Sequence, residues 1–218
     1  MPPPATIGLS APAGPRLAGS LWAARPGSPG VVVVPGLGSS RGNHADVAEA
    51  LQASGIAALA LDLRGHGDSD GCLDSGAPDD VVAGLTALAE RGHAPLGIRG
   101  SSMGGLLALH VAARDARVRA VVAICPARPD GLARLEEDDW PLALDPGAPP
   151  GADGVARGYW HATGDDQVPW GSTFALAGAA PHPKRLRIVL GGAHGSLQHD
   201  PAILAETVAF LAEHLARR

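Results

Sequence analysis

Three serines of this chain stand at the centre of a Gly-x-Ser-x-Gly pattern. The three matches are Gly38–Gly42, Gly67–Gly71 and Gly100–Gly104. Glycines at this spacing permit a sharp turn from a strand into a helix, on which the serine hydroxyl is exposed and can act as a nucleophile. Because 30 of the 218 residues are glycine, the pattern alone does not choose among the three serines.

The residues around each match single out Ser102. It follows an apolar strand directly (LGIRGS) and opens an apolar helix directly (MGGLLALHVAA), as the turn requires. Ser40 lies six residues past the run VVVV, too far for a strand to lead straight into the serine. Ser69 stands in the polar run RGHGDSDGCLDSG, which no helical pattern follows closely. We therefore predict Ser102 as the nucleophile.

A serine nucleophile needs a base, and the base needs a carboxylate that orients it, in the chain order Ser, Asp, His on this kind of turn. His194 lies just past the last strand, on the glycine-rich loop GGAHG, and is the predicted base. His199 is the rival, but it adjoins Asp200, the predicted cap of the last helix. The loop HATGDDQVP ends another strand and offers two carboxylates, Asp165 and Asp166.

The negative oxygen of an acyl-transfer intermediate needs two backbone N–H donors. Met103, the residue after the nucleophile, is predicted to supply one, and Leu37 in the loop PGLGSSRG the other. The remaining histidines do not stand at metal-ligand spacing on one face, so we expect neither a metal nor a cofactor. Cys72 and Cys125 are expected to be free thiols.

Short apolar runs that alternate with helical patterns would position these residues, which predicts an α/β fold with a mostly parallel central sheet. After a hairpin formed by Thr6–Ser10 and Arg16–Ala24, the predicted strands are Val31–Val34, Ile56–Asp62, Leu96–Arg99, Val118–Ile124, Val155–His161 and Arg185–Leu190. Each reads as buried on both faces. The predicted helices are Ala45–Ser54, Asp79–Glu90, Met103–Arg114, Ser172–Ala179 and Pro201–Ala216. Residues 1–218 are interpreted as one domain, in which Pro126–Gly154 forms a short cap or loop.

Composition excludes several kinds of partner. The net charge of −5 and the absence of clustered Lys and Arg argue against nucleic acid and against an anionic membrane surface. The chain begins without the basic and apolar segments of a signal peptide, and its apolar runs are too short to span a membrane. The sequence therefore predicts a cytoplasmic protein that acts on a small molecule, with its oligomeric state left open.

Together these motifs resemble the α/β-hydrolase superfamily, especially its small esterase, lipase and dienelactone-hydrolase-like members. VVVVPGLGSSRG is similar to the oxyanion loop, GSSMGG to the nucleophile turn, GDDQVP to the acid loop and GGAHG to the histidine loop. The family's acid usually precedes Val-Pro by three residues, which selects Asp165 over Asp166. Pro35 departs from the family, since many relatives have His at that position. The resemblance implies the α/β-hydrolase fold, with helices on both faces of the sheet.

The expected activity is that of a serine carboxylesterase on small soluble esters, through an acyl-enzyme on Ser102. Thioester and amide hydrolysis use the same groups and stay open. Trp140 and Trp170 are open as pocket or packing residues. A rival of another class is an NAD(P)-binding oxidoreductase, because VVVVPGLGSSRG is a strand with a glycine loop and Asp62 ends the next strand. A non-catalytic binding protein of the same fold is a further rival.

Overall fold

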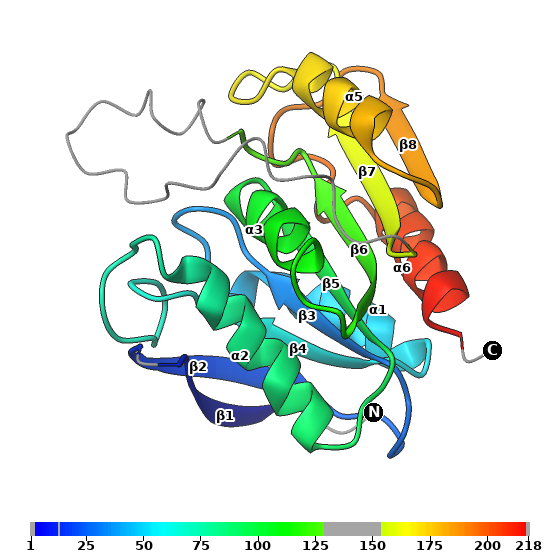
Figure 1. The fold of residues 1–218 in the computed structure, drawn as a ribbon. Helices are drawn as coiled ribbons and strands as arrows, with labels where there is room; N and C mark the ends of the chain where they lie inside the picture. The colour runs from blue at the N-terminus through cyan, green and yellow to red at the C-terminus, as the bar shows by residue number, and fades with distance from the viewer. Residues whose placement is uncertain (1–2, 13, 129–153, 217–218) are drawn as a thin grey trace.

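The structure is a computed structural model that describes residues 3–12, 14–128 and 154–216. One eight-stranded sheet runs through it, in the order β1-β2-β4-β3-β5-β6-β7-β8 (Figure 1). The strands are β1 (Ala5–Ser10), β2 (Arg16–Trp22), β3 (Gly30–Val34), β4 (Ala57–Leu61), β5 (Leu96–Ser101), β6 (Val118–Ile124), β7 (Ala156–Ala162) and β8 (Lys184–Val189). The pairs β1–β2 and β2–β4 are antiparallel and all the others are parallel. This arrangement confirms the predicted fold class.

Helices cover the sheet on both sides. They are the short 3-10 helix η1 (Arg41–His44) and the α-helices α1 (Ala45–Ala53), α2 (Ala77–Glu90), α3 (Met103–Ala112), α5 (Trp170–Ala179) and α6 (Pro201–Leu215). Figure 1 shows α2, α3 and α5 in front of the sheet and α1 and α6 behind it. Among the described residues, no helix is both long enough and apolar enough to cross a membrane.

The four consecutive valines of β3 pack into two separate core layers, one on each face of the sheet. Side chains alternate between the faces of a strand, so a central strand covered on both sides needs apolar residues at every position. Val32 and Val34 pack in the layer that contains α2 and α3. Val31 and Val33 pack in the layer that contains α1 and α6. All five residues of β3 are buried, which fixes this strand at the centre of the molecule.

The last strand, β8, is less buried than the sequence predicted. The predicted strand Arg185–Leu190 read as buried on both faces, but β8 begins at Lys184, ends at Val189 and alternates in exposure along its length. It lies at the end of the sheet, and among the described residues only β7 pairs with it. Leu190, beyond the strand, is 89% exposed. The other boundaries agree with prediction to within two residues, and η1 was not predicted. Most of the expected cap, with Trp140, lies outside the described residues.

Candidate active site

Ser102 stands on the turn between β5 and α3 in a backbone conformation that few residues other than glycine adopt. Its φ is +53° and its ψ is −121°. Such a conformation persists only where the surroundings enforce it. Here the Ser102 N–H donates to the carbonyl of Ile124 at 2.9 Å, and the Ser102 carbonyl accepts from Leu106 and Ala127 at 3.1 and 3.0 Å. These bonds to β6, α3 and the segment after β6 hold the strained turn and fix the direction of the hydroxyl.

The two glycines of the pattern are required by the backbone that crosses here. A Cβ on Gly100 would collide with the backbone of Gly104. A Cβ on Gly104 would collide with the carbonyl oxygens of Val34 and Pro35, at the end of β3. The helix therefore lies against the sheet without intervening side chains at this point, which brings Ser102 close to the loop that follows β3.

A chain of hydrogen bonds joins the three residues predicted to react. The Ser102 Oγ lies 2.8 Å from His194 Nε2, and His194 Nδ1 lies 2.7 Å from Asp165 Oδ2. Since a carboxylate only accepts, Nδ1 carries the ring proton and Nε2 is free to accept from the serine hydroxyl. The Asp165 side chain is fully buried and that of His194 is 12% exposed. The fold thus assembles a nucleophile, a base and an orienting carboxylate from three separate loops.

Asp165 is held by its own loop. Its Oδ1 accepts from the backbone N–H groups of Gln167 and Val168, at 2.9 and 2.8 Å. Burial alone would raise the pKa of Asp165, but the Val168 N–H and the contact with His194 outweigh it, so the pKa lies below its ordinary value. The carboxylate is therefore ionised at neutral pH. The neighbouring Asp166 is exposed.

The acid loop and the histidine loop are bonded to each other. Gly191 and Gly192, which lead to His194, have φ of +72° and +75°, and glycine adopts this region without strain. The Gly191 N–H donates to Thr163 Oγ1 at 2.9 Å, and the Gly164 N–H donates to the Gly191 carbonyl at 3.1 Å. This connection keeps the base and its carboxylate at a fixed separation.

A cavity of about 330 Å³ opens beside Ser102 and His194. Its described lining is Gly36, Leu37, Ser39, Ser101, Ser102, Ala127, Arg128, Gln167, Val168, Pro169, His194, Gly195 and Gln198. A Cβ on Gly36 would stand 3.3 Å from the Ser102 Cβ, so the loop backbone comes close to the nucleophile there. Leu37 thus lies in the wall of the cavity, and Met103, the first residue of α3, directly follows the lining residue Ser102. Trp170 is not part of this lining and packs edge-to-face on Phe174.

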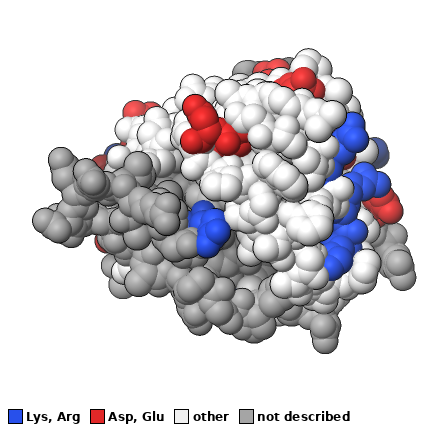
Figure 2. All heavy atoms as spheres, turned by 90° about the horizontal axis from the view of Figure 1, so that it is seen from above, with Lys and Arg blue, Asp and Glu red and all other residues white. Residues whose placement is uncertain are grey.

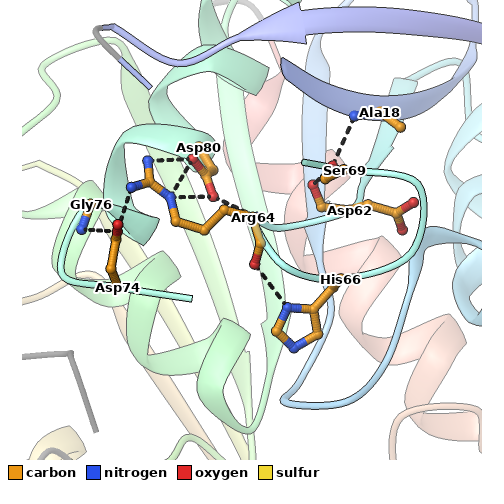
Figure 3. Close-up of polar contacts among 8 residues, drawn as sticks. All are labelled: Ala18, Asp62, Arg64, His66, Ser69, Asp74, Gly76 and Asp80. Atoms are coloured by element: carbon orange, nitrogen blue, oxygen red, sulfur yellow. Dashed lines mark hydrogen bonds and ion pairs between the residues drawn. The ribbon is translucent and has the colours of Figure 1, made fainter. Parts of the chain in front are cut away.

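The two other serines lie in local structure away from His194 and Asp165. Ser40 immediately precedes η1. Ser69 accepts from the Ala18 N–H at 2.9 Å and donates to the Asp62 carbonyl at 2.7 Å, which ties its loop to β2 (Figure 3). In a dinucleotide-binding protein, the Asp62 carboxylate would bind the ribose of the cofactor. Here it pairs with Arg41 and accepts from the Asp68 N–H. The observed contacts therefore give no support to the oxidoreductase reading.

The long loop from β4 to α2 is fixed by a buried ion pair. Arg64 donates to both carboxylate oxygens of Asp80, which is fully buried, and also pairs with Asp74 (Figure 3). The Asp74 carboxylate in turn accepts from the Gly76 N–H at 2.8 Å. His66 adds a contact from its Nδ1 to the Arg64 carbonyl at 3.0 Å. These contacts give the polar run around Ser69 a structural explanation.

Two residues that the sequence did not single out also contact Asp165. His161, expected to be structural or solvated, is fully buried at the end of β7, with Nε2 3.1 Å from Asp165 Oδ2. Its only sequence signal is its position four residues before Asp165. Cys125 is buried next to Asp165, and burial raises the pKa of its thiol to about 12. Like Cys72, it is a free cysteine, as predicted.

The protonation states of the groups around Asp165 favour hydrogen bonding over metal binding. Ligand atoms of Cys125, Asp165 and His194 lie within 4.8 Å of one another. However, the thiol stays protonated at neutral pH, whereas a metal ligand must be the thiolate. The His194 nitrogen nearest Asp165 carries the proton of the 2.7 Å bond and has no lone pair for a metal.

Comparisons with known proteins show what the chain is similar to. A family model described as serine aminopeptidase, S33, matches residues 28–134. A curated thiohydrolase of Eupenicillium brefeldianum is 33% identical over 119 residues, which cover 50% of this chain and 39% of that protein. The chain thus matches well under half the length of this curated relative.

Solved structures match over nearly the whole chain. The α/β hydrolase GrgF of Penicillium sp. sh18 has a TM-score of 0.81 and 20% identity, covering 99% of this chain and 100% of GrgF. Est1E of Butyrivibrio proteoclasticus, solved with ferulic acid, has a TM-score of 0.80 and 20% identity, covering 97% of this chain and 100% of Est1E. At these identities the likeness shows the fold alone.

Proposed function

We propose that the chain, which has the α/β-hydrolase fold, is a serine hydrolase of that superfamily, a carboxylesterase for small soluble esters. The observation that carries the proposal is the chain of hydrogen bonds from Ser102 Oγ through His194 to Asp165 Oδ2. A free serine hydroxyl is a weak nucleophile, and a base within hydrogen-bond reach activates it.

In the proposed reaction, Ser102 Oγ attacks the ester carbonyl carbon while its proton passes to His194 Nε2. The carbonyl oxygen becomes an oxyanion that accepts from the N–H groups of Met103 and Leu37. His194 then gives its proton to the departing alcohol, leaving an acyl group on Ser102. A water molecule repeats the sequence and releases the acid. Asp165 stays ionised throughout and stabilises the imidazolium.

The size and character of the cavity favour a small, uncharged substrate. At about 330 Å³ it lies at the lower end of the usual range for ligand pockets, and Leu37, Ala127, Val168 and Pro169 give it apolar walls. The face drawn in Figure 2 consists mostly of uncharged residues in its described part, with one Lys or Arg group near its middle, others along one edge, and a few Asp or Glu groups. A neutral ester with a short acyl chain suits such a site.

The test uses a series of p-nitrophenyl esters of increasing acyl length. We expect hydrolysis, strongest for short chains, that is abolished in Ser102→Ala and retained in Ser40→Ala and Ser69→Ala. A fluorophosphonate should label the wild-type protein at Ser102, as peptide mass spectrometry would show. Labelling at another serine, or full activity in Ser102→Ala, would refute the proposal.

Thioester hydrolysis is the second candidate, because the 33% identical relative is a thiohydrolase. The same three residues serve both reactions, so the leaving group decides between them. The comparison is kcat/KM for N-acetylcysteamine thioesters against oxoesters with the same acyl group. A thioester preference larger than the difference in their uncatalysed hydrolysis rates would favour this second function.

A further inference from the structure

His161 contacts the same oxygen of the proposed catalytic carboxylate as His194 does. It is the second-last residue of β7, and its side chain is fully buried. Its Nε2 lies 3.1 Å from Asp165 Oδ2 and 3.0 Å from the carbonyl oxygen of Val168. Its Nδ1 lies 2.7 Å from Thr173 Oγ1, on α5. Both ring nitrogens therefore have partners, and one partner belongs to the site.

The partners determine which nitrogen carries the proton. The Val168 carbonyl and the Asp165 carboxylate can only accept, so Nε2 must donate. Nδ1 is then the acceptor for the Thr173 hydroxyl, which can donate to it. Burial lowers the pKa of His161, so the ring is neutral when the enzyme works near pH 7. His161 is thus an uncharged donor whose single Nε2–H is shared between the Val168 carbonyl and Asp165 Oδ2.

With this shared donor, each of the four acceptor positions of the Asp165 carboxylate faces a nitrogen. Oδ1 accepts from the N–H groups of Gln167 and Val168, whereas Oδ2 accepts from His194 and lies 3.1 Å from His161 Nε2. A carboxylate has about four such positions. The two backbone N–H groups and His161 stay uncharged throughout, whereas His194 gains and loses a charge as its Nε2 takes up and gives back a proton in each turnover. The plane of the carboxylate is therefore fixed by groups that do not react.

We propose that His161 is a positioning residue, whose Nε2–H holds Asp165 Oδ2 against His194 Nδ1. This inference rests on the proposed function. His161 touches neither the serine nor the cavity, and acts only through Asp165. Without the His161 N–H, Oδ2 would keep only His194 and the neighbouring Cys125 thiol, and the carboxylate would be held mainly through Oδ1. His194 would then be less well aligned with Ser102.

Two amide substitutions separate this role from simple packing. The amide nitrogen of Gln can stand where His Nε2 stands, whereas that of Asn reaches only the place of Nδ1. We expect His161→Asn to lower kcat for p-nitrophenyl acetate by about 10- to 100-fold, the range for misplaced reacting groups, with KM changed by less than about twofold. His161→Gln should keep kcat within about threefold of wild type.

A control and a double mutant test whether the effect passes through Asp165. Trp160→Phe removes a fully buried side chain on the same strand and its 3.0 Å bond to Glu206, so it should lower the melting temperature and leave kcat unchanged. In an Asp165→Asn background, His161→Asn should lower kcat no further, because the carboxylate it positions is gone. Equal losses in His161→Gln and His161→Asn, or full additivity with Asp165→Asn, would overturn the proposal.

A measurement on the His161 ring itself does not depend on whether the His161 variants fold. In protein labelled with ¹⁵N-histidine, the NMR spectrum should show His161 as the Nε2–H tautomer, and Asp165→Asn should shift that proton. An Nδ1–H tautomer would overturn the proposal. If Asp165→Asn itself leaves kcat intact, the proposed function fails and this role with it. If only His161→Asn is without effect, this role alone fails.

Discussion

At the scale of single residues, the backbone decides which of two adjacent aspartates serves the site. Asp165 points inward because its Oδ1 accepts from Gln167 and Val168 N–H, which turns the loop around the carboxylate. Asp166, one residue later, points to solvent. The two have the same charge and almost the same place in the chain, so a substitution at each isolates the effect of orientation.

We predict that Asp165→Asn lowers kcat by at least about 10²-fold, whereas Asp166→Asn lowers it by less than about tenfold. An asparagine at 165 can offer its amide N–H to His194, which favours the tautomer that cannot accept from Ser102. Steady-state kinetics on p-nitrophenyl acetate measure both values, and circular dichroism checks that both variants are folded. A reversed order would assign the orienting role to Asp166.

How much of the site the sequence could predict depends on how local each signal is. The strand before Ser102 and the helix after it are neighbours in the chain, and His194 is marked by its glycine loop. From the residues alone, either Asp165 or Asp166 could be the carboxylate that orients His194, and only the family resemblance chose between them. His161 could not be found, because a buried histidine on a strand is ordinary and its role arises from a contact across the β7–α5 loop.

At the scale of elements, the junction of β5 and α3 depends on the two glycines Gly104 and Gly105. Both lie in the first turn of α3, and alanine would favour the helix at each by about 1 kcal/mol. Their surroundings differ. A Cβ on Gly104 would collide with two backbone carbonyls of the β3 end, whereas a Cβ on Gly105 would find its nearest neighbour, the Pro126 Cα, at 3.2 Å.

We predict that Gly104→Ala lowers the free energy of unfolding by about 1–3 kcal/mol, the usual cost of overpacking, and lowers kcat more than tenfold because α3 and Ser102 are displaced. In Gly105→Ala, the helix gain and the tight contact should nearly cancel, leaving stability within about 1 kcal/mol of wild type. Urea denaturation and ester kinetics on the pair provide the test. Equal effects at both positions would contradict the steric argument.

Arg99 connects β5 to the loop that carries His194. It is fully buried, donates to the Gln198 carbonyl at 2.9 Å, and has no carboxylate in contact among the described residues. Burial lowers the pKa of Arg99 to about 10, so it remains a cation at neutral pH. An unpaired buried cation is costly by several kcal/mol, more than the 1–3 kcal/mol of an unsatisfied carbonyl.

Arg99→Met should therefore raise the melting temperature while it lowers kcat several-fold, because the loop beyond His194 loses its connection to β5. Calorimetry and kinetics on the same preparation test both halves. Arg99→Lys, which keeps the charge but shortens the reach, should lower kcat without the gain in stability. A loss of stability in Arg99→Met would show that the bond to Gln198 outweighs the cost of the buried charge.

The elements themselves were predictable where their environment is uniform. The central strands are apolar throughout because helices cover both of their faces, and the predicted boundaries of β6 hold to the residue. The edge strand β8 was misread, since its exposure depends on having a neighbour on one side alone. Helix η1 was missed because its four residues have too few positions to show a period.

At the scale of the whole molecule, the buried histidines make stability depend on pH. Burial lowers the pKa of His44, His93 and His161. Each is neutral in the folded protein at a pH at which the unfolded chain already binds a proton. The unfolded state therefore takes up more protons as the pH falls below about 6.5, and the free energy of unfolding decreases there. Above about pH 6.5 these histidines are neutral in both states, so they do not make the free energy of unfolding depend on pH.

His44 should contribute most of this dependence. Burial beside Arg99 and His199 lowers its pKa from 6.5 to about 4, with Asp46 opposing, and neither ring nitrogen has a hydrogen-bond partner among the described residues. At about 1.4 kcal/mol per pKa unit, the protein should lose up to about 3 kcal/mol from this residue between pH 6.5 and pH 4. His44→Leu fills a similar volume and cannot be protonated, so that part of the loss should vanish. Urea denaturation at a series of pH values measures both slopes, and an unchanged slope in His44→Leu would place the pH sensitivity elsewhere.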